Sequence, residues 1–470
     1  MADASTVCFD ADRMRRYDRE GPRYTSYPTA QHFAPGIALS DYERAAATSE
    51  GARDGQPLSA YVHMPFCSSP CFYCGCNKII THRLDRIERY AALLLREISL
   101  RARLFDRNRV IDQLHFGGGT PTFLPPKLLL EIIDRFSREF HLTTAEGRDY
   151  SIEIDPRGAD RDMLRLLASL GFKRVSLGVQ DFDENVQRAV NRIQPESTVA
   201  SVYETARELG FGSINFDLIY GLPLQTVVSF AATLDRVIAL RPDRLAVYGY
   251  AHMPRLFKAQ RQIRSEDLPS AGVRLSLLQL AVGKLSEAGY EYIGMDHFAL
   301  PADSLAQARR SGTLHRSFQG YTTHANRDLV SFGVSAIGQV GDLYIQNHKS
   351  VKEYEAAIAD GRLPSNRGKT MNFDDRIRKD VINSLMCHGF VDRGAFERRH
   401  GLVFDRYFAS ELERLRSLEA DNLVELNSGR IALTPVGRLL MRTVAMVFDA
   451  YIPTAPHAAP AGPESMSRVI

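Results

Sequence analysis

Four of the chain's six cysteines fall within ten residues, in the stretch CSSPCFYCGC, as Cys67, Cys71, Cys74 and Cys76. Thiolates spaced two and three residues apart suit zinc or an iron-sulfur cluster, because one loop can then fold several sulfurs around a metal centre. Structural zinc sites usually combine two separated cysteine pairs, and this sequence has no second pair. The spacing therefore favours an iron-sulfur cluster.

The fourth cysteine of this loop decides what kind of protein the cluster would serve. Cys67, Cys71 and Cys74 can reach three irons of a four-iron cluster from one loop, and Cys76 follows Cys74 by two residues. With Cys76 on the fourth iron the cluster would be closed and suited to electron transfer. Without it, one iron would be open to a small molecule. The spacing alone leaves both alternatives open.

The elements around this loop alternate between strand and helix. Residues 83–105 carry apolar side chains at helical spacing and predict an amphipathic helix. Strands are predicted over 59–66, 110–119, 150–156, 172–180, 213–223 and 244–251. Strands that alternate with helices indicate an α/β fold with a parallel sheet, here an incomplete (β/α)6-type barrel whose functional groups lie at the carboxyl ends of its strands.

Glycines mark the ends of three predicted helices. Gly171, Gly210 and Gly289 each stand between a helical stretch and a strand, with an aromatic residue directly after. A left-handed residue commonly terminates a helix, and glycine adopts that conformation most easily. We expect all three glycines to be left-handed.

Polar side chains occupy strand faces where a barrel interior is expected to be apolar. Because side chains alternate along a strand, Glu153, Gln180 and Asp217 face away from their apolar neighbours. Each could cap a nearby helix, but three on successive strands favour a polar ligand inside the barrel. The glycine run 117–119 follows a strand and is expected to let the main chain approach that ligand and offer it N–H donors.

Regions on either side of this core differ in pattern. Residues 1–55 read as an ordered arm without strong helix or strand periodicity, 56–365 as the barrel domain, and 366–470 as a smaller, mostly helical domain. Near its end the last region predicts a strand, an Asn-Ser-Gly turn, a second strand and a helix capped by Thr434 with Pro435 at its first position. That order resembles a winged-helix module.

Composition excludes some classes of partner. The formal charge of +3 gives no basic footprint for nucleic acid, so we expect the C-terminal domain to pack or to close the site instead. No stretch reaches eighteen apolar residues and the start lacks the apolar core of a signal peptide, so we expect a cytoplasmic protein without membrane contact.

Longer motifs resemble a known family. A Cx3Cx2C loop after the first strand of such a barrel is the signature of the radical S-adenosylmethionine superfamily. Within it, the sequence is similar to the oxygen-independent coproporphyrinogen III oxidases (dehydrogenases) from about residue 15 to the end. The resemblance is carried by the motifs YVHMPFCSSPCFYCGCNK, GPRYTSYPT, LHFGGGTPTFL, EIDPR, GVQDF, FDLIYGLP, GMDHF, GYTT and the terminal SRVI.

The resemblance implies cofactors and the residues that hold them. It implies one [4Fe-4S] cluster held by Cys67, Cys71 and Cys74, and two S-adenosylmethionine molecules per chain. By position, the residues that line the first S-adenosylmethionine site are Tyr61, Gly118, Glu153 and Ile337. Those around the second are Tyr73, Gly119, Thr120, Gln180, Arg192, Asp217 and Ala251.

It also implies an activity. Family members convert two propionate side chains of coproporphyrinogen III into vinyl groups by oxidative decarboxylation, giving protoporphyrinogen IX for haem synthesis. The expected partners are this substrate and a low-potential electron donor such as flavodoxin or ferredoxin, with the chain acting as a monomer. No acid or base catalyst is expected. Arg23 and Lys78 are candidates, by motif position, to meet the substrate carboxylates.

Other functions compete with this one. A haem-binding or haem-trafficking relative would share the barrel and cluster without decarboxylation, and a radical methyltransferase or haem-degrading enzyme would also share them. A ferredoxin-like electron carrier would use Cys76 as its fourth ligand. The CGCNK run and the GPRYTSYPT arm favour the oxidase, and 470 residues with a polar-lined barrel argue against a simple carrier.

Overall fold

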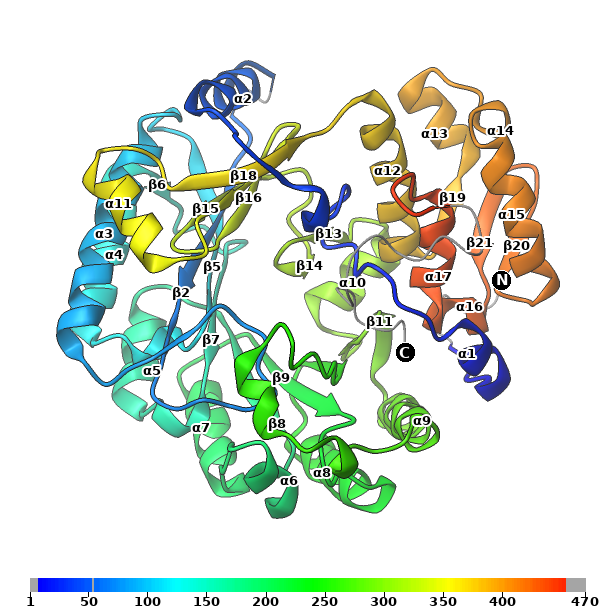
Figure 1. Cartoon of the computed structure of the whole chain (residues 1–470), viewed down its shortest axis with the longest axis horizontal. Coiled ribbons are helices and arrows are strands. Elements are labelled where there is room, and N and C mark those ends of the chain that lie inside the picture. Colours follow the sequence, from blue (N-terminus) through cyan, green and yellow to red (C-terminus); the bar gives the residue numbers. More distant parts are fainter. Residues whose placement is uncertain (1–6, 53–54, 454–470) are drawn as a thin grey trace.

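One large sheet organises the chain, and its central strands are parallel (Figure 1). The computed structural model describes residues 7–52 and 55–453. Neighbouring strands follow the order β15-β2-β5-β7-β8-β9-β10, and every pair in that series is parallel. Their bounds are β15 Asp328–Phe332, β2 Leu58–Met64, β5 Val110–Gly118, β7 Asp149–Ile154, β8 Arg174–Gln180, β9 Ser213–Tyr220 and β10 Arg244–Gly249. The predicted α/β fold and its six parallel strands, β2 to β10, are confirmed.

The sheet extends further than the sequence predicted. β15 is a seventh parallel strand, and antiparallel strands continue the sheet beyond both ends of the parallel series. Beyond β10 these are β12 His297–Ala299 and β11 Glu291–Gly294; beyond β15 they are β16 Ile337–Val340, β17 Leu343–Asn347, β18 Ser365–Thr370 and β1 Ala34–Pro35. Short connections without a helix join β11 to β12, β15 to β16 and β16 to β17, so the strand-helix alternation did not reveal most of these strands.

Helices follow the parallel strands and lie outside them (Figure 1). The long helices are α3 Leu84–Ala102, α4 Pro126–Glu139, α5 Arg161–Ser169, α7 Glu196–Glu208, α8 Val227–Leu240 and α9 Ala271–Glu287. α3 is the predicted amphipathic helix, and it buries Ile87, Leu94 and Ile98 against the sheet. The predicted left-handed glycines are confirmed, with φ of +88° at Gly171, +79° at Gly210 and +84° at Gly289.

The N-terminal arm contains more regular structure than predicted. The arm was predicted to lack strong helix or strand periodicity, and it nevertheless contains two helices, α1 over Ala11–Tyr17 and α2 over Leu39–Ala52. α2 is rich in alanine, serine and threonine and gives a weak apolar stripe, which explains why its sequence did not reveal it. Residues 21–29 between these helices are not helical, as expected, and bury Tyr24 and Tyr27.

Those two tyrosines join the arm to the end of the described chain. Tyr24 Oη donates to Asp449 at 2.9 Å, and Tyr27 Oη accepts from the Ala450 N–H at 3.0 Å. Figure 1 shows this segment, in blue, running between the barrel and the C-terminal helices. The arm is therefore anchored, through both tyrosines, to the residues that follow the C-terminal helices.

The C-terminal region combines helices with a small antiparallel sheet. Its strands, in the spatial order β19-β21-β20, are Phe390–Asp392, Arg430–Leu433 and Val424–Leu426. Its helices are α12 Phe373–His388, α13 Arg393–His400, α14 Phe404–Tyr407, α15 Ala409–Ala420, α16 Pro435–Leu439 and α17 Met441–Ala445. The predicted cap is confirmed, because Thr434 Oγ1 accepts from the Gly437 N–H at 2.9 Å. The SRVI motif at 467–470 lies outside the described residues.

The described helices were compared with the length and apolar content of membrane-spanning helices. Among residues 7–52 and 55–453 we find no helix with the length and apolar content that crossing a bilayer requires.

A buried carboxylate on α3 fixes the strand ends that lie over it. Glu97 is fully buried and accepts hydrogen bonds from Arg101 Nε at 2.8 Å and from Asn347 Nδ2 at 2.8 Å. It also accepts from the Gly333 N–H at 2.7 Å and from Tyr354 Oη at 2.6 Å. One side chain thus joins α3 to β17, to the loop after β15 and to helix α11, Val351–Ala359.

Replacing this carboxylate should destabilise the whole fold. Glu97→Ala leaves Arg101 charged and buried without its partner, so we expect the free energy of unfolding to fall by about 3–5 kcal/mol. Denaturant titration followed by circular dichroism measures this change. Asp134→Ala, which breaks the exposed Asp134–Arg138 pair on α4, serves as control and should leave stability nearly unchanged. Equal losses in both variants would contradict the role given to Glu97.

Candidate functional site

Two adjoining cavities open at the carboxyl ends of the parallel strands. We name them by their contents: the cysteine cavity, of about 310 Å³, contains the cysteine loop, and the histidine cavity, of about 430 Å³, is lined by His63, His115 and His297. Glu153 and Tyr248 line both cavities, so the two spaces meet at these side chains. This is the edge at which a parallel barrel carries its functional groups.

Most of the predicted site residues line these cavities. Those in the cysteine cavity are Cys67, Cys71, Cys74, Tyr73, Gly118, Gly119, Thr120, Glu153, Gln180, Arg192 and Asp217. Tyr61 and Ile337 line the histidine cavity, so the residues predicted to share the first S-adenosylmethionine site are divided between the two spaces. Ala251 lies next to the cysteine loop, since Gln260 Nε2 donates to both its carbonyl, at 3.1 Å, and that of Tyr73, at 2.9 Å.

The cysteine loop is fastened to the barrel at several points. His63 Nε2 lies 2.9 Å from the Asn77 carbonyl, so this nitrogen carries the proton and donates. Its Nδ1 lies 3.1 Å from Tyr61 Oη, which then donates to it. On the other side, Asn191 Nδ2 donates to the Pro70 carbonyl at 2.7 Å. Both ends of the loop are therefore held by neighbouring strands and loops.

Cationic and hydroxyl groups surround the cysteine thiols. Arg157 Nη2 and Arg192 Nη1 lie 3.8 and 3.6 Å from Cys71 Sγ, and Thr120 Oγ1 lies 3.6 Å from Cys67 Sγ. Guanidinium groups offset the negative charge of a thiolate-bound cluster. In the described part of the chain, no three His, Cys, Asp or Glu side chains converge as a single metal ion requires. Ligands that bind separate irons need no such point, so this donor set fits a cluster.

Cys76 lies directly beside Cys74. Its N–H donates to Cys74 Sγ at 3.4 Å, and a hydrogen bond between the two side chains is the main reason that the pKa of Cys74 falls to about 5. A thiol with a low pKa is largely in the thiolate form that binds metals. Cys76 is exposed, whereas Cys71 is buried, so the four thiols of the loop are not equivalent.

Gly118 and Gly119 of the glycine run allow close packing, and their N–H groups donate within the protein rather than to a ligand. The expectation that it offers N–H donors to a ligand is wrong for Gly118 and Gly119, whose N–H groups donate to Glu153 Oε2 at 3.0 Å and to the Met64 carbonyl at 2.7 Å. Gly118 has φ of +116°, and a Cβ there would lie 2.6 Å from the His63 ring. A Cβ on Gly119 would lie 2.7 Å from the Phe66 carbonyl oxygen. Both glycines let β5 approach the start of the cysteine loop.

Glu153 and Asp217 both line the cysteine cavity, but their pKa values are shifted in opposite directions. Burial alone would raise the pKa of Glu153, but the nearby His115 ring, 3.5 Å away, and the Gly118 N–H lower it below its usual value. Burial raises the pKa of Asp217 to about 7, and the negative charge of Glu153 adds to this rise, although hydrogen bonds from Ser176 and Asn215 oppose it. At neutral pH, Glu153 is ionised and Asp217 is partly protonated.

Sequence reasoning missed much of the histidine cavity. His63, His115, Tyr248, His297 and Arg316 line it, and none was a candidate. His63 and His115 could have been found, because they alternate with apolar residues on β2 and β5 as Glu153 does on β7. His297 and Arg316 lie on three-residue strands, which carry no periodic signal.

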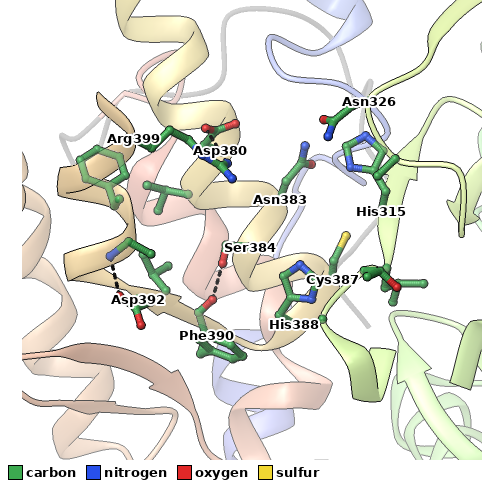
Figure 2. A pocket seen from close by; sticks show the side chains of 18 of the residues that line it. His315, Asn326, Asp380, Asn383, Ser384, Cys387, His388, Phe390, Asp392 and Arg399 are labelled. Carbon is green, nitrogen blue, oxygen red and sulfur yellow. Dashed lines mark hydrogen bonds and ion pairs between the residues drawn. The ribbon is translucent and has the colours of Figure 1, made fainter. Parts of the chain in front are cut away.

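A third cavity lies away from the strand ends. It measures about 340 Å³ and is bounded by α12, α13 and the segment after α10 (Ser304–Ser311). Figure 2 shows Asp380 and Arg399 together on one wall and His315, Cys387 and His388 on the other. Asp380 pairs with Arg399 at 3.3 Å and with His400 at 2.9 Å, so its charge is matched within the wall. We therefore place the functional site at the first two cavities.

Comparisons with known proteins agree with this site. Residues 61–237 match the family model described as Radical SAM superfamily, and residues 372–440 match the HemN C-terminal domain. The oxygen-independent coproporphyrinogen III oxidase of Pseudomonas aeruginosa is 51% identical over 449 residues, covering 96% of this chain and 97% of that protein. Its counterpart from Escherichia coli is 45% identical over 446 residues, covering 95% and 96%.

The arrangement of strands agrees as well. The solved structure of coproporphyrinogen III oxidase (HemN) from Escherichia coli, described as a radical SAM enzyme, matches with a TM-score of 0.90 at 44% identity. The match covers 95% of this chain and 100% of that one.

Fold and cysteine site together define a radical S-adenosylmethionine enzyme, which implies a [4Fe-4S] cluster and S-adenosylmethionine as cofactors. Within that superfamily, the chain belongs to the family of oxygen-independent coproporphyrinogen III oxidases.

The raised pKa of Asp217 predicts a pH-dependent effect in cluster-free protein. Between about pH 4 and 7 the folded state keeps a proton that the unfolded state has released, so stability falls as the pH rises through this range. The free energy of unfolding lost over this range is about 1.4 kcal/mol for each unit that separates the folded and unfolded pKa of Asp217. Asp217→Asn cannot titrate and therefore removes this loss. We expect the Tm of the variant, relative to the unsubstituted protein, to rise between pH 5 and pH 8.

Asp149→Asn is the matched control. Arg174, 2.8 Å away, holds the pKa of Asp149 well below its usual value even though burial would raise it. Both its folded and unfolded pKa then lie below pH 5, so its effect on Tm should be the same at pH 5 and pH 8. An Asp217→Asn effect that is equally independent of pH would contradict the assignment.

Proposed function

We propose that this chain oxidatively decarboxylates two propionate side chains of coproporphyrinogen III to vinyl groups, giving protoporphyrinogen IX. The observation that carries this proposal is the junction of the two cavities at Glu153 and Tyr248. A cofactor held in the cysteine cavity would thus lie next to a molecule in the histidine cavity, with Glu153 and Tyr248 bordering both. Relatives that align over nearly the whole chain bear the name of this activity.

The cofactors would be held by the residues described above. Cys67, Cys71 and Cys74 would bind three irons, while Arg157 and Arg192 balance the charge of the thiolates. When bound, the cluster and S-adenosylmethionine supply the one-electron chemistry that removes a hydrogen atom from the β carbon of a propionate. No step requires a protein acid or base, so we assign none.

The protein's own contribution is to position the cofactors and the substrate and to keep water away from them. Ionised Glu153 is suited to accept hydrogen bonds from the amino group of a first S-adenosylmethionine, with Tyr61, Gly118 and Ile337 around it. We propose that a second molecule lies near Asp217 and Arg192, with the remaining predicted residues Tyr73, Gly119, Thr120, Gln180 and Ala251. Holding the reacting groups in line and excluding water accounts for catalysis of this kind.

Further parts of the proposal concern partners and organisation. We propose a monomeric, cytoplasmic enzyme that receives electrons from a low-potential donor such as flavodoxin or ferredoxin and binds no nucleic acid. Its near-neutral net charge supports the last point. We also keep the division into an arm (1–55), a barrel domain (56–365) and a C-terminal domain (366–470) that helps to close the site.

Anaerobic turnover tests the activity directly. Reconstituted protein, reductant, S-adenosylmethionine and coproporphyrinogen III should together release two molecules of carbon dioxide for each protoporphyrinogen IX formed. Mass spectrometry of the tetrapyrrole and trapping of the gas measure both products. Tight haem binding with no carbon dioxide would refute the oxidase and favour a haem-trafficking protein.

Cluster assembly tests the roles of the cysteines. Cys67→Ser should lose the cluster, because a hydroxyl replaces one of three ligands, whereas Cys76→Ser should still assemble four irons per chain. Iron analysis and the absorption spectrum after reconstitution measure the difference. Cys8→Ser, a change at an exposed cysteine outside the loop, is the control and should match the unsubstituted protein. Equal cluster loss in the Cys67 and Cys76 variants would refute the three-ligand assignment.

A further inference from the structure

One buried arginine on the wall of the histidine cavity lacks a negative partner. Arg316 lies on β13, His315–Ser317, and its side chain is nearly inaccessible, with the residue 4% exposed. Its Nη2 donates to the Arg23 carbonyl at 3.3 Å, and its guanidinium lies 4.6 Å from the centre of the Tyr321 ring. Within residues 7–52 and 55–453, its Nε and Nη1 have no hydrogen-bond partner. Leaving donors of a buried cation unpaired is costly, so a ligand is expected to meet them.

Each of the other arginines that line the two cavities contacts a carboxylate. Arg23 forms an ion pair with Asp296, and Arg157 and Arg192 lie 2.7 and 2.9 Å from the same carboxylate oxygen of Asp155. Arg23, a candidate from the sequence, therefore enters the cavity wall already paired. Arg316 has no such carboxylate in the described structure.

The neighbouring His297 does not neutralise the positive charge of Arg316. His297 lies on the same wall, and burial together with the charge of Arg316 lowers its pKa to about 3, so it is neutral. Its Nδ1 is also buried without a partner among the described residues. Glu153, whose pKa is lowered and which is therefore ionised, lines the same cavity. The cavity is thus lined by one positive side chain, Arg316, that has no carboxylate partner in the described structure, and by one negative side chain, Glu153.

Only one of the spaces beside Arg316 suits a carboxylate. A second void borders the arginine, but at about 30 Å³ it has room for little more than a water molecule. The histidine cavity, about 430 Å³, is the one that opens toward the cysteine cavity. An anion paired with Arg316 in that space would belong to the molecule that faces the cofactors.

We propose that Arg316 binds a propionate carboxylate of the tetrapyrrole substrate and so sets its orientation in the histidine cavity. This inference rests on the proposed function. Guanidinium binds carboxylate through strong, charge-assisted hydrogen bonds, while ionised Glu153 in the same cavity would repel a carboxylate placed beside it. A carboxylate held at Arg316 directs the rest of the molecule toward Glu153 and Tyr248, where the cavities meet. Arg316 is thereby a specificity-determining residue and takes no part in the radical chemistry.

Substitution of Arg316 should separate substrate binding from cofactor binding. Arg316→Met keeps much of the volume but removes the charge, and we expect KM for coproporphyrinogen III to rise about 10- to 100-fold. Arg316→Lys keeps the charge and should recover part of that loss. KM for S-adenosylmethionine and the absorption spectrum of the cluster should stay the same in both variants. Arg393→Met removes a buried arginine paired with Asp405 on α13, away from the cavities, and should leave both KM values unchanged.

A binding measurement without turnover tests the same contact independently. Fluorescent coproporphyrin III, titrated with the unsubstituted protein and each variant, should bind more weakly to Arg316→Met than to Arg316→Lys. Its tetramethyl ester, in the same buffer, should bind the unsubstituted protein and Arg316→Met with similar affinity, because the carboxylate is then masked. If Arg316→Met does not fold, Arg316→Lys and Arg316→Gln carry the comparison.

The outcomes separate this inference from the proposed function. An unsubstituted protein that releases no carbon dioxide refutes the function, yet a carboxylate-dependent preference of Arg316 for coproporphyrin III would still support the contact. An active unsubstituted protein, with KM and coproporphyrin affinity of Arg316→Met within twofold of its own, would overturn the inference and leave the function standing.

Discussion

A carboxylate inside a barrel keeps its charge only when enough donors or positive charge surround it, and the site depends on how this requirement is met. Glu153 on β7 has the Gly118 N–H and the His115 ring, so its pKa lies below the usual value. Asp217, two strands further along the sheet, accepts hydrogen bonds only from the neutral side chains of Ser176 and Asn215, and burial raises its pKa to about 7. Two acids on one polar surface thus differ in charge at neutral pH, which gives the interior one anionic and one partly protonated position.

Rigidity at the strand ends comes from the helix behind them. On α3, Tyr90 Oη donates to the His63 carbonyl at 2.8 Å and accepts from the Val334 N–H at 3.0 Å. About two turns later on the same helix, Glu97 accepts from the Gly333 N–H. The same helix therefore holds the end of β2, which leads into the cysteine loop, and the end of β15, which leads into the wall of the histidine cavity. The relative position of the two cavities is fixed from outside the barrel.

The sequence predicted the elements that have a repeated apolar pattern. It did not predict the role of a residue when that role depends on one contact with a residue far away in the sequence. The parallel strands and α3 were predictable from periodicity, and Glu153, Gln180 and Asp217 from their strand faces. The glycine run was misread, because the need for Gly118 and Gly119 arises from His63, on the neighbouring strand β2, and from Phe66, just beyond that strand. Helix α2 has too weak an apolar stripe to reveal itself.

Short strands hid the rest of the site in the same way. His297 and Arg316 belong to three-residue strands whose neighbours give no period. The unpaired state of Arg316 follows from what surrounds it in space, which no local stretch of sequence records. The cysteines of residues 67–76, by contrast, lie on one loop, and their spacing was sufficient to suggest a cluster.

The contacts of the N-terminal arm impose an order on the making of the protein. Arg442 donates to the carbonyls of Gly21 and Pro22, and Asp449 accepts from Tyr24, partners more than 400 residues later in the chain. The cysteine cavity, in contrast, is lined entirely by residues between Cys67 and Tyr248. Because domains fold as they leave the ribosome, the strands that bear the cysteine loop can assemble while the arm beside Arg23 still lacks its C-terminal anchor. The hydrogen bonds that Arg442 and Asp449 make with the arm can form only after the whole cysteine cavity has been synthesised.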